Sequence, residues 1–174
     1  MSIAIPICHP DFPAWKGAAP VFDFGHKPLL DLQGKAAFAE LVILRLLQAE
    51  GWEGSWIETY GGVHYLQDMP TDWKLQSVHV AIPPEREELL KRIWEKGKST
   101  ACFDVMVWKN GQVLFCEAKR KGKDRLTGAQ YKFIEAALEC GVKPEQLLIV
   151  EWNMVDQTAE TLEKSGNASQ VPTL

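Results

Sequence analysis

The pattern of apolar and polar residues predicts three helices. The first covers 35–50, where apolar residues recur three and four positions apart, and Gly51 follows as a common stop signal. The second covers 84–97, with acidic residues in its first turn and basic residues in its last, as the helix dipole favours. The third covers 128–140 and begins after Thr127, a good N-cap residue.

Strand-like patterns, in which apolar residues alternate with polar ones or run together, lie between these helices. They cover 55–60, 76–82, 100–108, 113–119 and 147–152. The resulting order is helix, strands, helix, hairpin, helix, strand. This order predicts an α/β domain with a mixed central β-sheet flanked by helices.

The two ends of the chain differ from this middle part. Residues 1–30 contain five prolines between aromatic residues, and we expect an irregular arm there. Four aromatic residues are expected to hold the arm against the domain: Phe12, Trp15, Phe22 and Phe24. Residues 31–153 form the one predicted domain, and the polar tail 154–174 is expected to fray.

Composition narrows the class of protein. The chain has 174 residues, enough for one sizeable core, and a formal net charge of -4, which argues against a protein that coats nucleic acid with its whole surface. It has no apolar run of membrane-spanning length and no signal-like start, so no membrane partner is expected. Its four cysteines lack the spacing of a metal site, and we interpret them as reduced thiols. This interpretation predicts a cytoplasmic protein.

Two opposed carboxylates follow from the predicted hairpin. Asn110-Gly111 between two apolar runs is a strong signal for a two-residue turn. With that turn, Asp104 faces Glu117 across the strand pair, and Lys119 lies on the same face two residues further on. We therefore expect Asp104, Glu117 and Lys119 to converge at one end of the hairpin.

Both faces of this hairpin are apolar, so both are expected to be covered. The apolar residues predicted on the face of Asp104 are Met106, Trp108, Val113 and Phe115. Those predicted on the opposite face are Phe103, Val105, Val107, Leu114 and Cys116. Charged side chains at the end of such an interior hairpin are costly unless something pairs them.

This charged group is suited to phosphodiester hydrolysis. Two neighbouring carboxylates repel each other, and a divalent cation such as Mg²⁺ relieves the repulsion while also binding phosphate oxygens. An adjacent lysine can orient the attacking water or neutralise developing charge. The competing interpretation is a salt-bridged cluster that binds no metal, although directly opposed like charges destabilise a strand pair.

The stretch FDVMVWKNGQVLFCEAKRKGKDRLTGAQYKFIEAAL resembles the PD-(D/E)XK nuclease superfamily, and its VRR-NUC branch most closely. The resemblance covers about 100–152, extends to 35–60, and implies a restriction-endonuclease-like core. It implies that Asp104 and Glu117 bind Mg²⁺ or Mn²⁺ together with the backbone carbonyl of Ala118, and that Lys119 assists the attacking water. Gln130 and Glu40 match the residues that complete such a site. Phe103 stands where the family name has proline.

Two of these residues have a structural alternative. Thr127 and Gln130 have the spacing of a capping box, which alone would explain the glutamine. Glu40 lies on an amphipathic helix, where most glutamates are solvated.

A basic loop follows Lys119. The segment KRKGKDR, 119–125, holds five cations and one anion. Four of these cations are expected to contact phosphate: Arg120, Lys121, Lys123 and Arg125. The alternative is an ordinary solvated turn.

These observations together predict a metal-dependent nuclease that acts on DNA. The alternative is a non-catalytic nucleic-acid-binding or protein-interaction module that retains the nuclease fold. The sequence leaves open whether cleavage would be endo- or exonucleolytic, which nucleic acid is preferred, and the oligomeric state.

Overall fold

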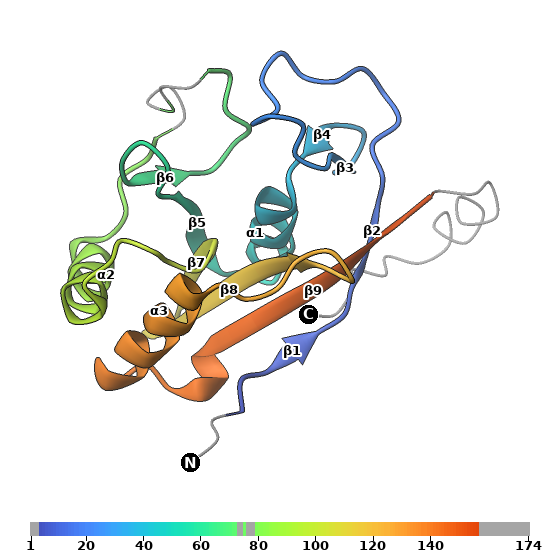
Figure 1. Ribbon diagram of the computed structural model, residues 1–174. Helices are drawn as coiled ribbons and strands as arrows, with labels where there is room; N and C mark the ends of the chain where they lie inside the picture. Colours follow the sequence, from blue (N-terminus) through green and yellow to red (C-terminus); the bar gives the residue numbers. More distant parts are fainter. Residues whose placement is uncertain (1–3, 73–74, 76–78, 157–174) are drawn as a thin grey trace.

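The protein is an α/β fold with a mixed sheet between helices, seen in a computed structural model that describes residues 4–72, 75 and 79–156 (Figure 1). The seven-stranded sheet has the order β1-β9-β8-β7-β5-β6, and β2 also pairs with β9. Its strands are β1 (Ile7–Cys8), β2 (Asp11–Pro13), β5 (Glu53–Glu58), β6 (His64–Leu66), β7 (Val105–Lys109), β8 (Gln112–Arg120) and β9 (Leu147–Val155). A separate small hairpin pairs β3 (Leu30–Asp31) with β4 (Ala36–Ala37).

Among the described residues, three α-helices cover the two faces of the sheet. They are α1 (Ala39–Ala49), α2 (Pro84–Gly97) and α3 (Gly128–Glu139), and a short 3-10 turn, Pro144–Gln146, precedes β9. Helix α1 packs on one face in a cluster that includes Val105, Val107 and Cys116. Helices α2 and α3 lie together on the other face, in a cluster that includes Met106 and Phe115 (Figure 1). The predicted fold class is therefore confirmed.

The hairpin of β7 and β8 has the predicted register. Lys109 pairs with Gln112, and the ladder continues to Val105 opposite Cys116. Asn110 and Gly111 both have positive φ, 51° and 78°, which is the backbone of a type I′ turn. The chain then returns through α3, so that β9 lies parallel to β8.

The prediction that Phe103 shares a face with Val105 and Val107 was wrong. The strand was expected to begin at 100, but β7 begins at Val105 and the chain bends at Asp104. Strand alternation therefore does not extend to Phe103, which packs below α2 and α3 with its ring 5.2 Å from that of Phe133.

The other predicted elements differ from the observed ones mainly at their ends. The helix predicted over 35–50 begins only at Ala39, because Ala36–Ala37 pair with β3. The strand predicted over 55–60 lies at Glu53–Glu58, and the final strand continues to Val155. The helix 84–97 is confirmed, and the third helix ends one residue earlier than predicted, at Glu139.

The prediction of a strand over 76–82 was largely wrong. Residues 76–78 lie outside the described part, His79 forms a single bridge with Leu66, and 80–82 are not in a strand. The partner of that bridge belongs to β6, which the sequence pattern did not reveal. No helix in the described ranges is long and apolar enough to cross a membrane.

The N-terminal segment is part of the sheet rather than only an irregular arm. Strands β1 and β2 both pair parallel with β9. Phe12 is 2% exposed and stacks on Trp152 with ring centroids 6.0 Å apart. Phe22 is also buried, against Phe24, whereas Trp15 is half-buried and donates to the carbonyl of Ala18.

Candidate active site

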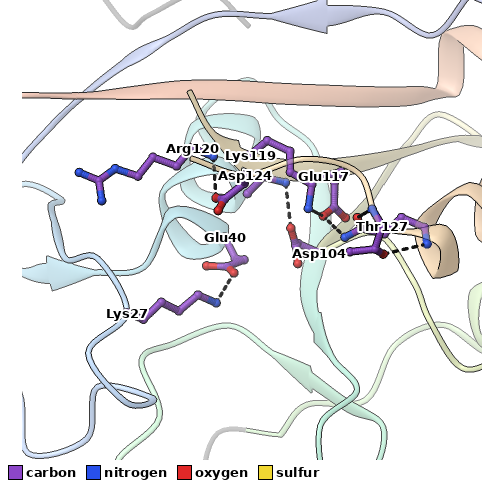
Figure 2. Close-up of polar contacts among 10 residues, drawn as sticks. Lys27, Glu40, Asp104, Glu117, Lys119, Arg120, Asp124 and Thr127 are labelled. Atoms are coloured by element: carbon purple, nitrogen blue, oxygen red, sulfur yellow. Dashed lines mark hydrogen bonds and ion pairs between the residues drawn. The ribbon is translucent and has the colours of Figure 1, made fainter. Parts of the chain in front are cut away.

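The five predicted catalytic residues lie together at the end of β8 that is away from the hairpin turn, between α1 and α3. Figure 2 shows Asp104 between Glu40 and Glu117, with Lys119 beside Glu117. Four elements supply these side chains: α1 supplies Glu40, the bend before β7 supplies Asp104, β8 supplies Glu117 and Lys119, and α3 supplies Gln130. The register of the hairpin and the crossover through α3 are therefore what assemble the site.

Asp104 is held by hydrogen bonds to both neighbouring strands. Its Oδ2 accepts from the Ala118 N–H at 2.8 Å, and its backbone carbonyl accepts from the Ile57 N–H at 2.7 Å. Loss of solvent raises the pKa of Asp104 well above its usual range, and the negative charges of Glu117 and Glu40 raise it further. The positive charge of Lys27 lowers the pKa of Asp104, but burial and the two glutamates outweigh it.

Glu117 is almost fully buried. Its Oε1 accepts from Lys119 Nζ at 2.7 Å and from the side-chain amide of Gln130. Its exposed fraction is 1%, and its Oε2 has no hydrogen-bond partner within the described ranges. Burial raises the pKa of Glu117 to about 7, although the charge of Lys119 acts in the opposite direction.

Gln130 forms the predicted capping box and also contacts Glu117. Its Oε1 accepts from the Thr127 N–H at 2.8 Å, and its own N–H donates to Thr127 Oγ1 at 3.3 Å, which completes the capping box. The remaining amide nitrogen donates to Glu117. The cap therefore fixes the amide in the orientation that contacts the carboxylate.

Glu40 is not a solvated helix residue. It is 5% exposed, it forms an ion pair with Lys27 through Oε1, and its Oε2 has no hydrogen-bond partner among the described residues. Its charge raises the pKa values of both Asp104 and Glu117.

Lys27 is the site residue that sequence reasoning missed. It comes from the segment between β2 and β3, and its ammonium reaches Glu40 (Figure 2). Burial alone would lower the pKa of Lys27, but the charges of Glu40 and Asp104 outweigh this and raise it. No motif spacing marks this lysine; the one available signal is its place in the aromatic stretch FDFGHK.

The basic loop lies beside this site and is only partly solvated. Lys121, Lys123 and Arg125 are exposed, whereas the guanidinium of Arg120 lies over the ring of Trp152 at 5.8 Å. Arg120 N–H also donates to Asp124, which closes the turn. A cavity of about 320 Å³ lies between this loop and Glu40; its lining includes Lys27, Glu40, Ala118, Arg120 and Lys123.

The donor atoms fit a hard divalent cation. Among the described residues, no three His, Cys, Asp or Glu side chains are placed to hold a metal ion by themselves. Mg²⁺ needs only one or two carboxylates, because it retains water and takes phosphate oxygens as further ligands. Asp104 and Glu117 are such a pair, and a buried oxygen of Glu117 has no partner.

The raised pKa of Glu117 predicts an unusual pH dependence of stability. Between about pH 4.5 and 7 the folded state holds a proton on Glu117 that the unfolded state has released, so without metal the free energy of unfolding falls as pH rises. We expect this residue to contribute a loss on the order of 3 kcal/mol. Urea unfolding in EDTA at several pH values measures it, with Glu117→Gln as the variant that removes the effect.

The control is Glu135→Gln, which changes an exposed carboxylate on α3 and should keep the wild-type pH dependence. The same pH dependence in Glu117→Gln and the wild type would contradict the burial of a titrating carboxyl at this position.

Comparisons with known proteins return no similar protein: no family model, curated protein or solved structure matches the chain. These comparisons therefore neither support nor oppose the resemblance to a nuclease superfamily.

Proposed function

We propose that the protein is a divalent-metal-dependent nuclease that hydrolyses DNA phosphodiester bonds, built on a restriction-endonuclease-like core of the VRR-NUC type. The observation that carries this proposal is the convergence of Asp104, Glu117 and Lys119 at the open end of one hairpin. Two further groups from separate helices, Glu40 and Gln130, meet them there. A salt-bridged cluster without a ligand would not require buried carboxylate oxygens that lack a partner.

Each residue of the site has a role in this proposal. Asp104 and Glu117 would hold Mg²⁺ or Mn²⁺ with the backbone carbonyl of Ala118, and Gln130 orients Glu117 through its amide. The bound cation would lower the pKa of water and stabilise the charge on the phosphate. Lys119, 12% exposed, is placed to orient the attacking water and to neutralise developing negative charge.

The basic loop supports nucleic acid as the substrate. Its exposed cations follow Lys119 directly in the chain, and one of them, Lys123, lines the cavity that reaches Glu40. Contacts to phosphate bind any sequence, and their strength falls as salt concentration rises. The four cysteines are free thiols, which fits the cytoplasmic location that we propose.

The proposed function is tested by incubating the purified protein with labelled single-stranded, duplex and branched DNA. We expect cleavage of at least one substrate with Mg²⁺ or Mn²⁺ and none in EDTA. Cleavage that persists in EDTA would contradict the proposed chemistry. Binding without cleavage under every condition would favour the non-catalytic module instead.

The basic loop makes a separate prediction about binding. Replacing Lys121, Lys123 and Arg125 together by glutamine should weaken DNA binding and reduce the slope of log K against log salt by about 2 to 3. Fluorescence anisotropy between low and moderate salt measures this slope. The matched control changes the same amount of charge on α2, through Lys91, Arg92 and Lys96. An equal loss of slope in both variants would contradict a specific role for the loop.

A further inference from the structure

The ammonium of Lys27 is surrounded by aromatic rings and a carboxylate beside the candidate site. It lies over three aromatic rings, at 5.3 Å from the centroid of Phe38, 5.5 Å from Trp56 and 5.9 Å from Phe24. It also pairs with Oε1 of the buried Glu40. Aromatic faces and a carboxylate together are a favourable environment for a cation.

The backbone around Lys27 is anchored as well. Its N–H donates to the Asp23 carbonyl at 3.0 Å, and the neighbouring Phe24 packs edge-on against Phe38 of the core with centroids 5.6 Å apart. The segment therefore holds the Lys27 side chain in a defined position beside Glu40, as Figure 2 shows.

The formal charges of the site residues determine the electrostatic environment that a second cation would enter. Each of two carboxylates has its own lysine: Glu117 pairs with Lys119, and Glu40 pairs with Lys27. Asp104 interacts electrostatically with both glutamates and with Lys27. If all five groups are ionised, their formal net charge is -1, which a single divalent cation changes to +1. That value complements the single negative charge of a phosphodiester.

In two-metal sites the second ion lies about 4 Å from the first and needs carboxylate oxygens of its own. Beside Asp104 and Glu117, the buried carboxylate that could supply them is Glu40, one oxygen of which already pairs with Lys27 while the other has no hydrogen-bond partner among the described residues. A second ion would have to compete with the ammonium for the same side chain.

We propose that Lys27 takes the place of a second metal ion, so that the protein binds one divalent cation, at Asp104 and Glu117, and not two. This inference rests on the proposed function. It assigns to the N-terminal segment a positioning role: Lys27 neutralises and orients Glu40, and its charge, together with that of Lys119, makes the loaded site complementary to phosphate.

The test counts bound Mn²⁺ per chain without DNA, by isothermal titration calorimetry and by electron paramagnetic resonance. We expect one ion for the wild type, two for Lys27→Gln, and one for Lys27→Arg, which retains the charge. Glu40→Gln should also bind one ion, because Glu40 does not hold the first one. The matched control is Lys16→Gln, a lysine of the same segment that pairs with Asp156 and should leave the count at one.

Circular dichroism establishes that each variant is folded before its ions are counted. Two ions on the wild type would overturn this inference, and metal-dependent cleavage by the same sample would leave the proposed function standing. One ion on folded Lys27→Gln, or none on Glu40→Gln, would also overturn it. If Lys27→Gln does not fold, the counts for the wild type and Glu40→Gln decide. No ion on the wild type would contradict the proposed function itself, and this inference with it.

Discussion

Replacing Lys119 by methionine should slow DNA cleavage by a factor on the order of 10²–10³ and leave DNA binding nearly unchanged. The ammonium of Lys119 lies 2.7 Å from Glu117, and the Lys119 side chain is 12% exposed, so it contacts the buried carboxylate and is still accessible from solvent. Under the proposed function, its loss removes the group that would orient the attacking water and balance developing charge. Single-turnover rates at saturating protein separate this effect from binding.

The matched control is Lys121→Met, two residues further along and exposed. This variant should weaken DNA binding at moderate salt but cleave bound DNA at close to the wild-type rate, because its ammonium contacts no carboxylate of the site. Equal rates for Lys119→Met and the wild type would contradict the role of Lys119.

The second large effect concerns folding. Phe12→Ala should lower the free energy of unfolding by about 3–5 kcal/mol, because it removes a buried ring and leaves a cavity against Trp152. Trp152 belongs to β9, whose strand partners include β8, so the N-terminal strands support the sheet that carries the site. Urea unfolding at a fixed pH measures the change.

The control for Phe12→Ala is Val21→Ala, which truncates a fully exposed apolar residue in the same segment. We expect a change within about 0.5 kcal/mol there. Similar small values for both variants would mean that the segment is only a loose arm.

The hairpin could be predicted because its signals are local. Asn110 and Gly111 adopt the positive φ values that their residue types favour, and strand alternation then places Glu117 and Lys119 on one face. The capping box at Thr127 is equally local, and it predicted the start of α3 to the residue. These two signals position most of the candidate site.

The features of the fold and of the site that the sequence did not predict depend on contacts between distant parts of the chain. Strands β1 and β2 are two and three residues long, too short for a periodic pattern, and they form because β9 offers an edge. The bend at Asp104 interrupts alternation and reverses the side of Phe103. Lys27 reaches Glu40 through the packing of aromatic rings, which no spacing rule describes.

The central claim is that Asp104 and Glu117 form a metal site that cleaves DNA. The most direct measurement compares the wild type with Asp104→Ala on one DNA substrate with Mn²⁺, at equal protein concentration and with both proteins shown to be folded. We predict cleavage by the wild type and a loss of at least about a thousandfold in the variant. Equal cleavage by the two proteins would contradict the account.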